Sequence, residues 1–147
     1  MLDNFKKNLK KSFFKENAIK LIHPDLPKKF NSLRSEGVKI ALNTGYSVDI
    51  QEVLIDSLNM RDFIDGYISS ESVEHGRPDP FMIKELMNRF NIDNPQEVAK
   101  LGDTTIDIFE GKNANCGLSI GVLTGAETKE KLINAGADMV LNSVMDL

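Results

Sequence analysis

The hydrophobic and polar positions of this chain alternate between two repeat lengths. Short apolar runs predict strands, and apolar residues three or four positions apart predict helices between them. The predicted strands cover residues 38–42, 64–68, 98–101, 118–123 and 138–141. The predicted helices cover residues 26–36, 47–58, 79–90, 105–115 and 126–134. Strands and helices that alternate at this spacing predict an α/β fold with a parallel, doubly wound, Rossmann-like sheet.

The N-terminal segment differs from the rest of the chain. Its apolar residues recur at helical spacing among lysines, which predicts an amphipathic helix; they are Leu2, Phe5, Leu9 and Phe13. The His23-Pro24 step ends this pattern, because a residue before proline disfavours helix. Residues 1–30 contain eight lysines and three acidic residues, although the whole chain has a net charge of −4. We therefore expect a helical segment over 1–23 and a core domain over 24–147.

Composition narrows the possible classes of protein. A chain of 147 residues predicts one globular core, and no apolar run reaches the roughly 18 residues that cross a membrane. The charged start lacks the apolar centre of a signal peptide, and a single cysteine fits a reducing compartment. The acidic balance argues against general nucleic-acid binding. We expect a cytoplasmic protein that binds neither nucleic acid nor membrane.

Two carboxylates follow the predicted strand at 98–101. Asp103 comes directly after the strand and Gly102, and Asp107 stands four residues later as a helix begins. Residues four apart at the start of a helix share one face, and ligands of open α/β sheets bind at the carboxyl ends of the strands. Carboxylate oxygens of this kind suit Mg²⁺. An alternative reading is helix capping, which commonly places aspartate at a helix N-terminus.

Two further motifs are weaker on their own. Asn43-Thr44-Gly45 follows the first predicted strand, and it offers a hydroxyl and a glycine that a phosphate can approach. Arg77 lies in the Gly76–Pro80 loop and could bind phosphate with its planar guanidinium. Taken alone, the first motif is more typical of an ordinary turn, and the second is more typical of a solvated arginine in a proline-rich loop.

In combination and order, these motifs resemble the haloacid dehalogenase superfamily of phosphohydrolases. Four stretches are closest to the phosphonoacetaldehyde hydrolase branch: GVKIALNTGYS, GRPDPFMI, GDTTIDIFEGKNANCG and GVLTGAETKEKLINAGAD. The resemblance covers about residues 24–147. It implies a Mg²⁺-dependent hydrolase of a small phosphorylated or phosphonate substrate.

The resemblance also assigns roles to residues of this chain. It implies that Thr44, with Asn43 and Gly45, binds the phosphoryl group, and that Arg77 steadies the nucleophile and phosphate. It implies that Asp103 and Asp107 supply carboxylates for Mg²⁺. The catalytic set that the resemblance implies is therefore Thr44, Arg77, Asp103 and Asp107.

One part of the family pattern has no counterpart here. The superfamily begins with a strand that ends in Asp-x-Asp, which carries the nucleophile and the acid/base, and nothing before Thr44 fits it. Residues 1–22 resemble the end of a helical cap that relatives insert after this strand. We expect a truncated core whose missing strand lies between strands 38–42 and 98–101. Unpaired strand edges favour a partner, either a second copy or the missing N-terminal fragment.

Three functional hypotheses follow. The chain is the C-terminal part of a hydrolase, a non-catalytic module that binds phosphate and metal, or a structural protein with a borrowed fold. The presence of Thr44, Arg77 and Asp103 together favours the first two, and it does not separate them.

The first testable prediction is that this chain alone shows no metal-dependent phosphatase turnover, because the groups identified only bind and polarise a substrate. The assay uses an aryl phosphate and phosphonoacetaldehyde with Mg²⁺. Turnover that disappears in an Asp103→Asn variant, with contaminants excluded, would mean that the chain contains an unrecognised nucleophile.

Overall fold

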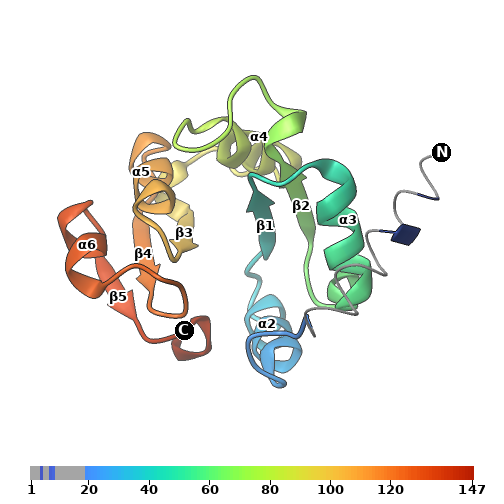
Figure 1. Cartoon of the computed structure of the whole chain (residues 1–147). Helices are drawn as coiled ribbons and strands as arrows, with labels where there is room; N and C mark the ends of the chain where they lie inside the picture. Colours follow the sequence, from blue (N-terminus) through green and yellow to red (C-terminus); the bar gives the residue numbers. More distant parts are fainter. Residues whose placement is uncertain (1–3, 5–6, 9–18) are drawn as a thin grey trace. The chain divides into compact units, whose positions relative to one another are not determined.

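The computed structural model of the protein describes residues 4, 7–8 and 19–147. The predicted amphipathic helix depends on Leu2, Phe5, Leu9 and Phe13, which lie outside the described residues. The chain divides into two compact units, Met1–Glu71 and Ser72–Leu147. Figure 1 labels their helices and strands, and each unit is described by itself.

The first unit is built on two parallel strands, β1 (Ala41–Thr44) and β2 (Gly66–Ser69). Helix α2 (Leu26–Ser35) precedes β1, and α3 (Val48–Ser57) with the short helix η1 (Met60–Asp62) connects β1 to β2. Figure 1 shows β1 and β2 side by side, with α3 next to β2. This is a strand–helix–strand connection of the kind that the alternating pattern predicts.

Local sequence explains the ends of these helices. Helix α2 has a proline in its first turn and is followed by Gly37 with a positive φ of 91°, a conformation that glycine adopts without strain. The hydroxyl of Ser47 caps α3 by accepting a hydrogen bond from the backbone of Ile50. The buried apolar residues of the unit are Leu26, Phe30, Val53, Ile55, Phe63, Ile64 and Ile68.

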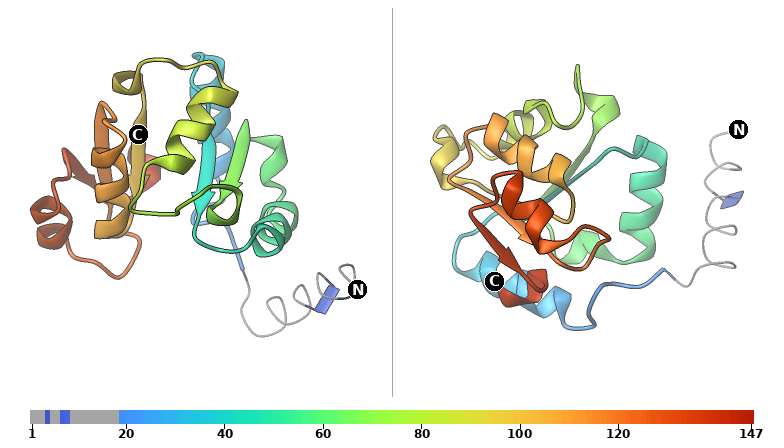
Figure 2. Two further views of the ribbon diagram at one scale, coloured as in Figure 1. Left: turned by 90° about the horizontal axis from the view of Figure 1, so that it is seen from above. Right: turned by 60° about the vertical axis from the view of Figure 1, so that its left-hand side comes forward.

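The second unit contains a three-stranded parallel sheet. Its strands are β3 (Ala99–Gly102), β4 (Leu118–Val122) and β5 (Met139–Leu141), in the order β3-β4-β5. Its helices are α4 (Phe81–Arg89), α5 (Thr105–Asn113) and α6 (Lys129–Asn134), with short helices η3 (Pro95–Glu97) and η4 (Val144–Asp146). Helix α5 packs on β3 and β4, and α6 packs on β4 and β5. Figure 2 shows these elements, coloured yellow to red, from two further directions.

The core of the second unit lies between its sheet and these helices. It contains Met82, Ile83, Ile108, Ala114, Cys116, Ile120, Val122 and Leu132. Leu132 is fully buried because Gly121 on the central strand leaves room for it. A side chain at position 121 would come within 2.9 Å of Leu132.

The α/β class and the parallel strands are confirmed. The strands form two separate sheets, so β1 and β3 belong to different sheets. Helix boundaries moved most at α6, which begins at Lys129 rather than at Ala126 because Thr128 provides its N-terminal cap. No helix among the described residues is long and apolar enough to span a membrane.

The exposed and buried faces of the helices were harder to predict. The buried faces of the helices include Ile55 of α3 and Met82 of α4, which are 2% and 0% exposed. On α5, Ile106 and Phe109 are 46% and 44% exposed, whereas Glu110 is fully buried. Polarity alone therefore misidentifies the inner face of α5, because that face carries charged side chains.

A stability prediction follows from the packing of α6. Replacing Leu132 by alanine removes a fully buried side chain, and we expect the free energy of unfolding to fall by about 2–5 kcal/mol. The neighbouring Ile133 is 49% exposed, so Ile133→Ala should cost less than about 1 kcal/mol. Urea unfolding followed by circular dichroism measures both variants. Equal losses would show that α6 does not pack as described.

Candidate functional site

The junction between β3 and α5 positions the two predicted carboxylates. Strand β3 ends at Gly102, Asp103 follows, and Thr104 is the N-cap of α5. Asp103 thus stands at the carboxyl end of β3, as the sequence predicts. This is the end of a parallel strand at which ligands of such sheets bind.

Asp107 is part of the cap of α5. One carboxylate oxygen, Oδ2, accepts hydrogen bonds from the backbone N–H of Thr104 at 3.2 Å and from its hydroxyl at 2.8 Å. The Thr104 hydroxyl in turn accepts from the Asp107 backbone, which completes a capping box. The capping interpretation therefore holds for Asp107.

The other oxygen of Asp107 faces two cations. Oδ1 accepts a hydrogen bond from Nη1 of Arg77 at 2.7 Å and lies 3.5 Å from Nζ of Lys100. The Asp107 side chain is 5% exposed. Both oxygens of this carboxylate are therefore engaged by the protein itself.

A fourth charged residue completes what we call the ionic cluster, namely Arg77, Lys100, Asp107 and Glu110. Glu110 follows Asp107 by three residues on the same face of α5, and its Oε2 lies 3.0 Å from Nζ of Lys100. Its side chain is fully buried, and that of Lys100 is 10% exposed. Two basic and two acidic groups thus balance one another in an environment where an unpaired charge is costly.

Two glycines allow α5 to come close enough to the sheet for these contacts. A Cβ at Gly102 would lie 2.1 Å from the Cβ of Asp107, so glycine is required where the carboxylate passes the strand end. A Cβ at Gly111 would lie 2.3 Å from the hydroxyl of Ser119 and 2.9 Å from the Cβ of Lys100. The geometry of the cluster therefore depends on the absence of side chains at both positions.

The pKa values of the two acidic groups in the cluster are shifted in opposite directions. Burial alone would raise the pKa of Asp107, but the charge of Lys100 and the hydrogen bonds from Arg77 and Thr104 outweigh it, and the pKa is lowered. Burial raises the pKa of Glu110 in spite of the neighbouring Lys100. Asp107 is thus stabilised as a carboxylate and Glu110 is not.

Asp103 has different surroundings. It is partly exposed, and none of the described residues forms a hydrogen bond or ion pair with its carboxylate. Its side chain passes close to Gly125, where a Cβ would lie 2.0 Å from Oδ2. Asp103 therefore keeps its oxygens available, in contrast to Asp107.

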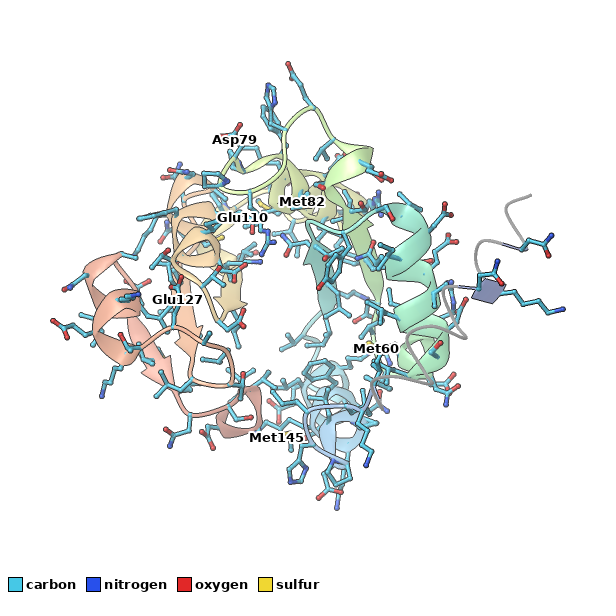
Figure 3. All side chains as sticks on the ribbon, in the orientation of Figure 1. Met60, Asp79, Met82, Glu110, Glu127 and Met145 are labelled. Carbon is cyan, nitrogen blue, oxygen red and sulfur yellow. The ribbon has the colours of Figure 1, made fainter. Side chains whose placement is uncertain are left out.

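Glu127 fastens the loop before α6 to the same helix terminus. Its carboxylate accepts a hydrogen bond of 2.7 Å from the backbone N–H of Thr105, the first residue of α5. Figure 3 labels Glu127 in this loop and Glu110 on α5. The same loop carries Gly125, which lies close to Asp103.

Arg77 approaches the cluster from the loop before α4. The carbonyl oxygen of the next residue, Pro78, accepts a hydrogen bond of 2.8 Å from the side-chain amide of Asn113 on α5. His75, directly before this loop, is 62% exposed and packs near the ring of Phe81. The loop is thus attached to α5 by Asn113 and by Arg77 itself.

The motif that the sequence predicts to bind phosphate lies in the first unit. Asn43 and Thr44 end β1 and Gly45 follows; the Thr44 hydroxyl accepts a hydrogen bond of 3.1 Å from the backbone of Tyr46. Arg77, Asp103 and Asp107 lie in the second unit. Within that unit the structure joins Arg77 to Asp107 directly.

Three residues at this site were not identified from the sequence: Lys100, Glu110 and Glu127. A lysine inside an apolar strand and a glutamate on the inner face of a helix are the signals that could have revealed the first two. Glu127 carries no comparable signal, because its contact depends on how the loop folds. Cys116 is buried, and its burial raises the pKa of its thiol to about 11.

Comparison with known proteins identifies the family. The model of the family described as haloacid dehalogenase-like hydrolase matches residues 6–115. The chain belongs to this family. The order of its motifs had predicted the same assignment.

Relatives within the family share about a third of the sequence. A phosphonoacetaldehyde hydrolase from Parabacteroides distasonis is 30% identical over 139 residues, which covers 78% of this chain and 52% of the relative. A phosphonoacetaldehyde hydrolase from Latilactobacillus sakei is 32% identical over 143 residues, with the same coverage. The chain thus spans about half the length of the curated relatives that it matches.

Solved structures support the fold. A phosphonoacetaldehyde hydrolase-like protein from Oleispira antarctica matches with a TM-score of 0.77 at 23% identity, over 85% of this chain and 54% of that one. A putative β-phosphoglucomutase from Thermotoga maritima matches with a TM-score of 0.78 at 23% identity, over 96% and 65%. At these identities the likeness concerns the fold alone.

The pKa shifts predict opposite pH dependences for two variants. Because the folded-state pKa of Asp107 is lowered, its contribution to stability is present above the unfolded pKa of about 3.9 and is lost as the pH falls through the folded-state value. The loss in free energy of unfolding caused by Asp107→Asn should therefore be larger at pH 6 than at pH 3. Because the pKa of Glu110 is raised, its ionisation at higher pH destabilises the folded wild type. The free energy of unfolding of Glu110→Gln should therefore increase relative to that of the wild type as the pH rises.

Urea unfolding at several pH values between 3 and 7 measures both differences. The two variants each remove one carboxyl group from the same face of α5, so each serves as the control for the other. If both differences change in the same direction with pH, the assignment of the two carboxyl groups is wrong.

Proposed function

We propose that this chain forms the phosphate- and Mg²⁺-binding part of a hydrolase that acts on a small phosphorylated or phosphonate metabolite. The observation that supports this function is the anchored arginine. Asp107 holds the guanidinium of Arg77 at the start of α5, directly after the strand end that carries Asp103. A fixed cation and an accessible carboxylate are what a phosphate–metal pair requires.

Arg77 is suited to phosphate. A guanidinium has five N–H donors in a planar fork, and the bond to Asp107 uses a donor on Nη1. The Arg77 side chain is 28% exposed, compared with 5% for Asp107, so it reaches the surface of its unit while its partner stays buried. Arginine in this arrangement would bind phosphoryl oxygens and stabilise charge that develops during transfer.

The carboxylates fit Mg²⁺ unequally. Mg²⁺ typically binds one or two protein carboxylates and completes its shell with waters and phosphate oxygens. Asp103 offers unengaged oxygens, whereas both oxygens of Asp107 are already hydrogen-bonded. No group of three or more acidic, histidine or cysteine side chains suited to a metal occurs among the residues that the structure describes. We therefore assign the metal to Asp103, with Asp107 acting on it indirectly.

A bound Mg²⁺ would neutralise charge on the phosphoryl oxygens during transfer. The chain's own residues would orient the substrate: Arg77 through its remaining N–H donors, and Thr44, Asn43 and Gly45 through the family motif that they match. We propose that the nucleophile is an aspartate supplied by the Asp-x-Asp motif that the family carries. The relatives named phosphonoacetaldehyde hydrolase make a phosphonate the first substrate class to test.

The test separates the metal from the phosphate. Calorimetric titration of Mg²⁺ should show an affinity at least about tenfold lower, or about 1.4 kcal/mol, for Asp103→Asn, and a smaller change for Asp107→Asn. Titration of inorganic phosphate in the presence of Mg²⁺ should show a loss of more than about tenfold for Arg77→Ala, because a hydrogen bond to a charged group contributes roughly 1.5–3 kcal/mol.

Asp93→Asn is the matched control for charge, because Asp93 is exposed, lies in the same unit and is not a member of the ionic cluster. It should leave both affinities unchanged. If the wild type binds neither Mg²⁺ nor phosphate, or if Asp93→Asn weakens binding as much as Asp103→Asn, the proposed function fails. Binding without turnover when the Asp-x-Asp motif is supplied would favour the non-catalytic alternative.

A further inference from the structure

We infer that Lys100 is a positioning residue: its ammonium group, held by Glu110, fixes the Asp107 carboxylate and thereby the guanidinium of Arg77. The contacts form a chain in which each member touches the next. Glu110 Oε2 lies 3.0 Å from Lys100 Nζ, Lys100 Nζ lies 3.5 Å from Asp107 Oδ1, and Asp107 Oδ1 accepts from Arg77. The relevance of Lys100 to phosphate binding rests on the proposed function.

The position of Lys100 in the fold supports this role. It lies on β3, three residues before Asp103, and its side chain reaches across to α5. Lys100 therefore connects the strand that carries Asp103 to the helix that carries Asp107. This connection fixes the position of Asp107 relative to Asp103, in addition to the capping box at Thr104.

Burial makes the interaction specific. Asp107 and Glu110 stand on one face of α5 with side chains that are 5% and 0% exposed. Without the ammonium group, these two carboxyl groups would lie near one another in a poorly solvated space, and a buried charge without a partner is strongly unfavourable. Arg77, which is 28% exposed, would then be the remaining cation of the cluster to balance the negative charge of both carboxyl groups.

A purely structural role for Lys100 predicts a different outcome. In that case Lys100 would stabilise the packing of α5 on β3, and its loss would lower stability without changing how Asp107 holds Arg77. The two roles differ in the rotational freedom of the Arg77 guanidinium. A guanidinium that is held by a carboxylate rotates slowly about its Cζ–Nε bond, so its two Nη groups give separate signals.

The experiment is ¹H–¹⁵N NMR of the arginine side chains of the full chain, without metal or phosphate, with the Arg77 signals assigned from an Arg77→Lys variant. The wild type should show separate Nη signals for Arg77. Lys100→Met should merge them, and Lys100→Arg should retain them. Inorganic phosphate, titrated separately with Mg²⁺, should bind about tenfold more weakly to Lys100→Met.

Lys112→Met is the matched control, because Lys112 also pairs with a carboxylate, Asp138 at 2.9 Å, but on the exposed side of α5. It should leave the Arg77 signals separate. If Lys100→Met does not fold, the double variant Lys100→Met/Glu110→Gln, which removes one charge of each sign, takes its place and should also merge the signals.

Three results would overturn the inference: averaged Arg77 signals in the wild type, separate signals in the folded Lys100→Met or double variant, or merged signals in the Lys112→Met control. A wild type that shows the expected NMR behaviour but binds no phosphate would refute the proposed function and leave the positioning role of Lys100 intact.

Discussion

Three largely buried charged side chains between β3 and α5, together with Arg77 from the loop before α4, impose the constraint on which the candidate site depends. The charged groups of Arg77, Lys100, Asp107 and Glu110 form ion pairs at distances of 2.7–3.5 Å. Replacing Lys100 would remove the cation that pairs with both buried carboxyl groups in a poorly solvated environment. Helix α5 can therefore take only a narrow range of positions on the sheet, and these are the positions in which its first turn follows directly from the end of β3.

Close packing at two glycines makes this arrangement possible. Gly102 lets the Asp107 carboxylate pass the strand, and Gly111 lets α5 approach Lys100 and Ser119. On the opposite face, Ile106 and Phe109 are half-exposed, because the inner face of the helix is taken up by charged groups and by Ile108. The helix therefore buries less apolar surface than its sequence would allow, and its inner face instead carries charged groups in fixed positions.

The same arrangement gives different environments to two carboxylates, Asp103 and Asp107, that look alike in the sequence. Asp107 is buried, hydrogen-bonded on both oxygens and has a lowered pKa, so it acts as a constant negative charge that orients Arg77. Asp103 is partly exposed and unengaged within the part of the chain that the structure describes. The proposed assignment of the metal to Asp103 follows from this difference in environment rather than from the identity of the residues.

The sequence alone determined the class of fold, the existence of the five strands and of the α-helices from residue 26 onward, and the family. Those features follow from local periodicity and from motifs whose order can be read directly along the chain. It also identified Asp103, Asp107 and Arg77 as a candidate set. It could not reveal that Glu110 faces inward, that Lys100 joins two carboxyl groups, or that Glu127 caps α5. Those contacts join residues through the packing of a helix on a strand and the path of a loop, and only the tertiary structure decides them, because side-chain burial and counter-charge depend on neighbours that are distant in sequence.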